Sequence, residues 1–87
     1  MATIDRLEIE LLIDSPHTIE APAYGQITPT IAQWRVANHR GSAYCTLFDD
    51  ANRNHTYYFT EEVPEWVPRP PDAWMAIVES MRAEATS

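Results

Sequence analysis

Apolar and polar residues alternate along several short stretches of this chain, and this alternation predicts β-strands. In residues 3–13 the apolar residues at every second position are Leu7, Ile9, Leu11 and Ile13. Glutamates stand between the first three of them. A period of two is typical of a strand that buries one face and exposes the other. A helix also fits part of this segment, so we prefer the strand and leave the helix open as an alternative.

The next residues predict a return of the chain. The Asp-Ser-Pro sequence at 14–16 favours a turn, because Asp and Ser bond to nearby backbone and Pro sets φ. Residues 17–24 are then expected to run back as the second strand of an N-terminal hairpin. Pro22 cannot donate a ladder hydrogen bond, so this strand lies at an edge or stops there. Residues 25–29 are expected to form a loop.

Three further alternating segments predict an antiparallel meander. Its strands are expected at residues 30–38, 43–48 and 55–60. Gly41 is available for the positive φ that a tight connection needs, and the polar loop at 49–54 has asparagines that tolerate the same conformation. The middle strand has partly apolar residues on both faces, which is typical of a central position in a sheet.

Proline dominates the segment that follows the meander. Residues 61–71 contain four prolines, which exclude a helix or a central strand, so this segment is expected to run extended. Trp66 and Val67 are expected to pin it to the sheet.

The C-terminal residues predict a helix that begins at Pro71–Asp72. Proline is favoured in the first turn, and Asp72 complements the amide dipoles there. The apolar positions recur at the spacing of one helix face, and they are Trp74, Ile77, Val78 and Met81. The helix is expected to end near Glu84 and to leave residues 85–87 as a frayed tail.

These elements predict one domain over residues 1–87 with an α+β fold. The fold is a small antiparallel β-sheet of four to five strands, a meander plus an N-terminal hairpin, with one C-terminal α-helix packed on it. The centre of its core is expected to consist of Trp34, Val36, Cys45, Leu47, Trp74, Ile77, Val78 and Met81.

Charge and composition narrow the kinds of partner. The net charge is −7, with both ends of the chain acidic and the middle nearly neutral. Acidic flanks repel phosphate backbones, so nucleic-acid binding is disfavoured. No apolar run approaches the ~20 residues that span a bilayer, and no secretory signal pattern is present at the N-terminus. We therefore expect a cytoplasmic protein that does not enter membranes.

The chain has six Arg, no Lys and eleven Ala. Arg and Ala codons are mostly rich in G and C, whereas Lys codons are rich in A and T. This bias predicts a high-GC bacterium, or one of its phages or prophages, as the source. Selection against lysine-targeted modification is a rival cause.

Candidate chemistry is sparse. His17, His39 and His55 have no second His or Cys at the spacing of zinc ligands. Cys45 falls on an apolar strand face, where a thiol is usually buried and inert. The acidic loop at 49–54 lacks the glycine and glutamate of a calcium-binding loop. We therefore predict no catalytic residues, no metal and no cofactor.

The function expected from these features is that of a small, acidic, non-enzymatic protein-binding module, such as a phage accessory protein that modulates a host protein. Tryptophan is enriched in interface hot spots, so the predicted partner-binding residues are Trp66, Val67, Arg69 and Met75. The alternative is a small enzyme or ligand-binding domain that uses Arg35, His55 and tyrosines on the sheet face. Self-association as a homodimer, through an unpaired sheet edge or the helix, is also open.

Overall fold

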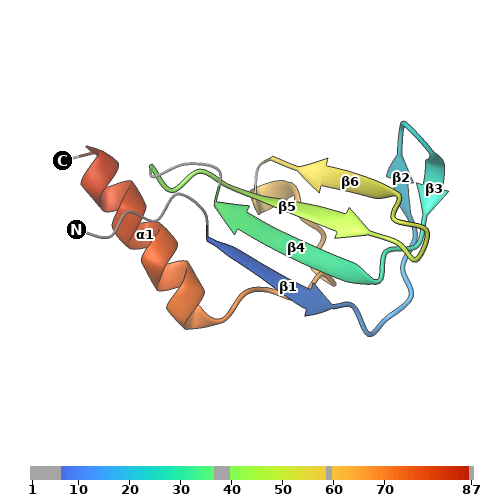
Figure 1. The fold of residues 1–87 in the computed structure, drawn as a ribbon, viewed down its shortest axis with the longest axis horizontal. Coiled ribbons are helices and arrows are strands. Elements are labelled where there is room, and N and C mark those ends of the chain that lie inside the picture. The colour runs from blue at the N-terminus through green and yellow to red at the C-terminus, as the bar shows by residue number, and fades with distance from the viewer. Residues whose placement is uncertain (1–6, 37–39, 59, 87) are drawn as a thin grey trace.

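The computed structural model describes residues 7–36, 40–58 and 60–86, without the side chains of Thr60 and Thr86. Within these ranges six strands and a short 3-10 helix precede one α-helix (Figure 1). Their bounds are β1 Glu8–Leu12, β2 Ile19–Ala21, β3 Gly25–Ile27, β4 Ile31–Val36, β5 Ala43–Phe48, β6 Asn54–Tyr57, η1 Thr60–Glu62 and α1 Asp72–Thr86. The predicted α+β class is confirmed.

The main sheet has four antiparallel strands in the order β1-β4-β5-β6. The predicted meander forms its β4-β5-β6 part, and the strand preference for residues 3–13 is confirmed for Glu8–Leu12. Gly41 connects β4 to β5 with a φ of 84°, as expected for a tight connection. The predicted strand residues 3–6, 37, 38 and 59 lie outside the described residues, and so does His39.

The predicted N-terminal hairpin differs from the structure. β1 pairs with β4, and β2 pairs with β3 in a separate two-stranded sheet that includes part of the expected 25–29 loop. Gly25 allows this tight turn with a φ of 89°, and the Tyr24 amide donates to the Ala21 carbonyl at 2.7 Å. Period-two patterns identify strands but do not choose their partners, and the long connection after β1 lets the chain leave the sheet before it turns.

The core lies against one face of the main sheet, which we call the inner face. It carries Ala32, Trp34 and Val36 from β4 and Ala43, Cys45 and Leu47 from β5, all at most 8% exposed. Residues 60–71, which we call the proline strap, run across this face and bury Val63 and Val67 against it. The Trp34 indole N–H donates to the Pro68 carbonyl at 3.0 Å, which ties the strap to β4. Val67 is buried and Trp66 packs against the core, so the prediction that both pin this segment is confirmed. The prediction that residues 61–71 run extended is wrong in part, because Thr60–Glu62 form a 3-10 helix and the Val67 amide donates to the Pro64 carbonyl at 3.1 Å in a turn.

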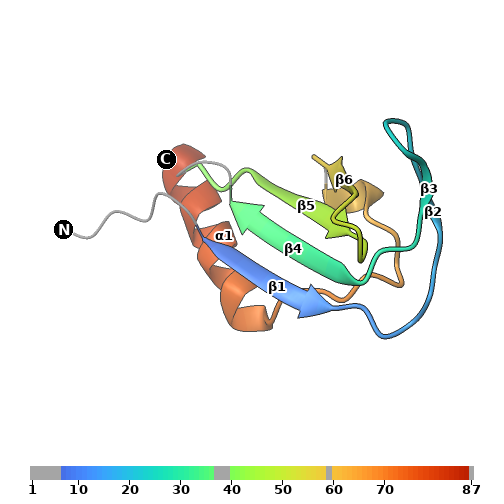
Figure 2. The ribbon, with the colours of Figure 1, turned by 45° about the vertical axis from the view of Figure 1, so that its right-hand side comes forward.

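α1 lies across one end of the same face (Figures 1 and 2). Trp74 packs edge-on against Trp34 with ring centroids 6.5 Å apart, and Val78 is 1% exposed. A methyl group at Gly41 would come within 2.5 Å of Arg82 Cγ, so the β4–β5 connection and α1 approach closely. The Arg82 guanidinium donates to the Gly41 carbonyl at 2.9 Å and secures this contact.

Two details of the predicted helix differ from the structure. Ile77, expected in the core, is 39% exposed, because α1 meets only the end of the sheet and one side of its apolar stripe has no facing element among the described residues. The helix continues through Thr86 instead of fraying at residue 85, as the high helix propensity of Ala and Glu permits. Among the described residues no helix is long and apolar enough to cross a bilayer.

Candidate functional site

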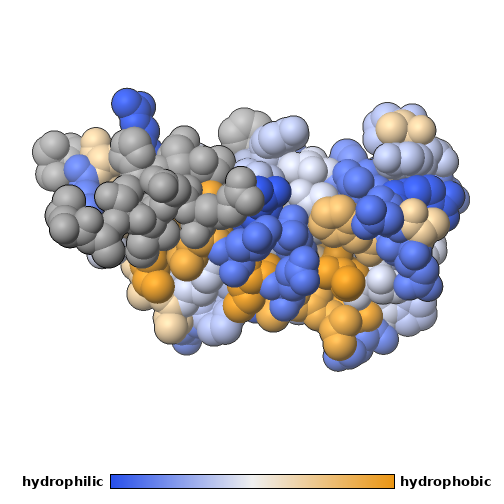
Figure 3. Space-filling model, viewed as in Figure 1, coloured by the Kyte–Doolittle hydropathy of each residue, from blue (hydrophilic) through white to orange (hydrophobic). Residues whose placement is uncertain are grey.

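The second face of the main sheet faces the viewer in Figure 1, and no described helix or loop lies over it. We call it the open face. It consists of the even-numbered residues in 8–12, 44–48 and 54–58 and the odd-numbered residues in 31–35, because side chains alternate between faces along each strand. Figure 3 shows hydrophobic patches beside strongly hydrophilic side chains over the part of this face that is not grey.

Arginine and tyrosine side chains gather at one end of the open face. The Arg35 guanidinium lies 5.5 Å from the centre of the Tyr44 ring, and the Tyr44 and Tyr58 rings are 6.0 Å apart. Arg35 also pairs with Glu8, with its Nε 3.4 Å from a carboxylate oxygen. Tyr58 is 71% exposed. Arg35, Tyr44 and Tyr58 line a hollow of about 410 Å3 that crosses β4, β5 and β6.

Polar contacts link the strands in the middle of the open face. The Gln33 amide donates to the Glu10 carboxylate at 3.2 Å, which joins β4 to β1. The Thr46 and Thr56 hydroxyls are 2.9 Å apart and join β5 to β6. Cross-strand pairs of this kind stabilise a sheet.

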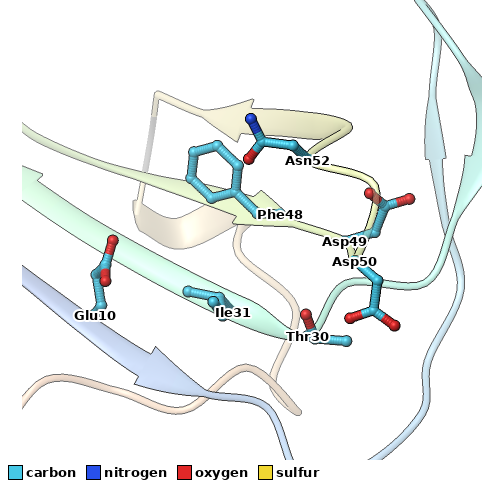
Figure 4. A pocket seen from close by; sticks show the side chains of 7 residues that line it. All are labelled: Glu10, Thr30, Ile31, Phe48, Asp49, Asp50 and Asn52. Carbon is cyan, nitrogen blue, oxygen red and sulfur yellow. The ribbon is translucent and has the colours of Figure 1, made fainter.

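The other end of the open face is acidic around an apolar floor. Ile31 and Phe48 lie between Glu10 on β1 and Asp50 in the loop after β5 (Figure 4), and these residues line a hollow of about 360 Å3. Leu12, opposite Ile31 in the register, is 74% exposed. An exposed leucine beside half-buried Ile31 and Phe48 is typical of a contact surface rather than of an isolated surface leucine.

Asp49 also lines this hollow, but its carboxylate is hydrogen-bonded within the turn that follows β5. One carboxylate oxygen accepts from the backbone amides of Ala51 and Arg53 at 3.0 and 2.8 Å, and the other accepts from the Arg53 guanidinium at 2.8 Å. Burial raises the pKa of the Asp49 carboxyl, but the hydrogen bonds and charge of Arg53 together with the Ala51 amide outweigh it and hold the pKa below its ordinary value. Asp49 is therefore a structural group, whereas Asp50 is exposed.

The residues predicted to bind a partner occupy different environments. Val67 is 2% exposed within the core, and Trp66 is half-buried and stacks on His17 with ring centroids 4.3 Å apart. Arg69 lies over the Trp34 ring and donates to the Val63 and Pro64 carbonyls.

Arg69 and Met75 line one hollow of about 480 Å3 between the proline strap and α1, and neither Trp66 nor Val67 lines it. Met75 is 37% exposed. The structure therefore brings together two of the four predicted residues, and it places the other two against their own chain.

The alternative site is also divided. Arg35 and two tyrosines meet on the open face, but His55 pairs with Leu47 in the register and packs edge-on against Tyr57 on the inner side. Burial raises the pKa of the Cys45 thiol to about 12, against a weaker lowering effect of the Arg69 charge, so this thiol stays protonated at neutral pH. Among the described residues no three His, Cys, Asp or Glu side chains gather where they could hold a metal ion.

Tyr58 is one of the tyrosines expected on the sheet face, whereas the sequence patterns did not identify Leu12, Ile31 or Phe48 as contact residues. The sequence did contain a signal for these residues. The strands at 30–38 and 43–48 carry sizeable side chains on both faces, and the elements predicted after the meander are one proline-rich segment and one helix. No family model matches this chain, and neither a curated protein nor a solved structure is significantly similar to it.

Proposed function

We propose that this chain is a small protein-binding module that acts by presenting its open face to a partner protein. The observation that carries the proposal is a face of a four-stranded sheet that no described element covers and on which Leu12 and Tyr58 are 74% and 71% exposed. Exposed aromatic and aliphatic side chains within a polar surround resemble the composition of protein interfaces.

The shape of the face supports a macromolecular partner over a small molecule. Small ligands bind in concave pockets that enclose most of their surface. The hollows on the open face are instead shallow parts of a continuous surface that extends from Glu10 to Tyr58. A flat partner surface or an extended segment could contact both ends at once.

We place the principal contact with the partner on the open face, and not on the proline strap as the sequence predicted. Val67 is buried and Trp66 is stacked on His17, so the strap offers mainly Arg69 and Met75. The hollow that those two residues line is a second surface, on the opposite side of the sheet. We keep the cytoplasm of a high-GC bacterium, with a phage or prophage gene, as the expected setting, and the base composition of the source gene tests that origin.

Site-specific photo-crosslinking tests the proposal. A photoreactive amino acid replaces Tyr58 on the open face, and in a control variant it replaces Glu79, which is exposed on α1. After irradiation in lysate of a high-GC bacterium, we expect one stoichiometric adduct from position 58 that is missing from position 79. Equal adducts from both positions, or none from position 58, would contradict a partner at the open face.

A further inference from the structure

β1 is an edge strand with an unused row of backbone hydrogen-bonding groups. The Val36 amide donates to the Leu7 carbonyl at 2.9 Å, and the Ile13 amide donates to the Thr30 carbonyl at 2.8 Å. In an antiparallel ladder the backbone groups of every second residue bond to the neighbouring strand. The amides and carbonyls of Ile9 and Leu11, like those of Leu7 and Ile13, therefore point toward β4. The amides and carbonyls of the residues between them, Glu8, Glu10 and Leu12, therefore point away from the sheet.

Among the described residues, the main device against strand addition at this edge is the negative charge of Glu8 and Glu10, which does not oppose a basic segment. The register of β1 with β4 is continuous over Glu8–Leu12, and that segment contains no Pro, Lys or bulge. None of the other backbone hydrogen bonds among the described residues uses the outward groups. In the order of the sheet, no described strand lies beyond β1.

The side chains of β1 are only partly covered on the inner side. Ile9 and Leu11 pack against the core but remain half-buried, because no described strand stands beside them on the outer edge. A further strand would cover both. Edge addition would therefore bury apolar area on the inner side as well as complete the backbone ladder.

The open-face side of the same edge is acidic. Glu8 and Glu10 project there, two residues apart, and Asp50 lies beside the hollow that Glu10 lines. One carboxylate oxygen of Glu8 pairs with Arg35, and one of Glu10 accepts from Gln33. The second oxygen of each carboxylate accepts no hydrogen bond from the described residues. The chain as a whole carries a charge of −7, which favours the approach of a basic segment.

We propose that the partner contributes an extended segment that adds to β1 as a fifth strand. Its basic side chains lie on the open face against Glu8 and Glu10, and its apolar side chains lie between them beside Ile9 and Leu11. Backbone hydrogen bonds supply affinity in strand addition, and the alternating side chains supply specificity. This inference rests on the proposed function and names the partner chemistry at one edge of the same surface.

A second copy of this chain is a poorer occupant of the edge. Two β1 strands related by a twofold axis at Glu10 would place Glu10 opposite Glu10, and an axis at Ile9 would place Glu8 opposite Glu10. Like charges directly opposite each other destabilise a sheet. In these two registers the like charges disfavour a homodimer through β1, and the charge of −7 on each copy repels a second copy in any register.

Peptide binding with amide hydrogen exchange tests this inference. The probe is a soluble peptide that alternates Arg and Val, and the control is the same peptide with every Arg amide N-methylated, which keeps the charge and removes the donors on the edge that would face β1. We expect the probe to slow exchange at the amides of Glu8, Glu10 and Leu12, and the control peptide to leave them unchanged. Equal binding of both peptides would indicate charge attraction without a strand and would overturn the inference.

Matched charge reversals complete the test. Glu10→Arg should weaken probe binding about tenfold, whereas Glu79→Arg, the same change on α1, should weaken it much less. Equal effects of the two variants, absence of saturable binding, or sedimentation of the free chain as a dimer that Glu10→Arg dissociates would each overturn it. Combining Glu10→Arg with the photoreactive residue at position 58 separates the two proposals. If the crosslink from position 58 to a partner is unchanged in this double variant, the edge inference fails and the proposed function stands.

Discussion

The two faces of β4 and β5 differ in burial although they share one backbone. On the inner face Ala32, Cys45 and Leu47 are fully buried, whereas Ile31 and Phe48, one residue away along the same strands, line an open hollow. The inner face is covered by residues 60–78, which arrive from the end of the chain. Burial in this molecule therefore depends on what second layer reaches a face, and less on how apolar that face is.

Thiol accessibility gives the largest expected contrast between the faces. Cys45 is 0% exposed on the inner face, and Leu12 is 74% exposed on the open face. In the Leu12→Cys variant, a thiol reagent should modify position 12 at the rate of a free thiol and Cys45 at least ~1,000-fold more slowly, because Cys45 reacts only after unfolding.

Mass spectrometry over time distinguishes the two cysteines. Adding a denaturant should equalise their rates, which serves as the control. If Cys45 reacted as fast as position 12 without denaturant, the inner face would be open in solution and the contrast between the faces would be wrong.

The same truncation at two leucines should have unequal effects on stability. Leu47→Ala removes a fully buried side chain from the inner face and should lower the free energy of unfolding by about 2–5 kcal/mol. Leu12→Ala, on the opposite side, should change it by no more than about 0.5 kcal/mol. Urea unfolding followed by circular dichroism measures both, and a large loss for Leu12→Ala would mean that something covers the open face.

The turn after β5, where the open face ends, should show the smallest effect. Asp49→Ala removes the acceptor for the Ala51 and Arg53 amides and should lower stability at neutral pH, whereas Asp50→Ala, next to it and exposed, should have little effect. The pKa of Asp49 is lowered in the folded state, so its stabilising contribution is present above the unfolded value of about 3.9 and is lost as pH falls through the lower folded value.

Thermal unfolding between neutral pH and strongly acidic pH measures this dependence. The difference between the native chain and Asp49→Ala should shrink as the solution becomes acidic. A difference that is constant over this pH range would show that the carboxylate charge contributes nothing.

Part of the candidate site could be derived before the structure. The alternating pattern placed Arg35 and the tyrosines on a sheet face, and Arg35, Tyr44 and Tyr58 do meet there. His55 could not be placed with them correctly, because its face depends on the register of β6 with β5. A shift of one residue in that register would exchange every side chain of β6 between faces.

Local sequence determined the elements of this protein. Alternation marked β1, β4 and β5, the prolines kept residues 63–71 out of any α-helix or strand, and Pro71–Asp72 marked the start of α1, because these features act within a few residues of chain. Only the tertiary structure decided that β1 pairs with β4, that Ile77 stays exposed and that no described element covers one face of the sheet. Each of these depends on contacts between distant segments, and a local pattern does not specify which segments meet.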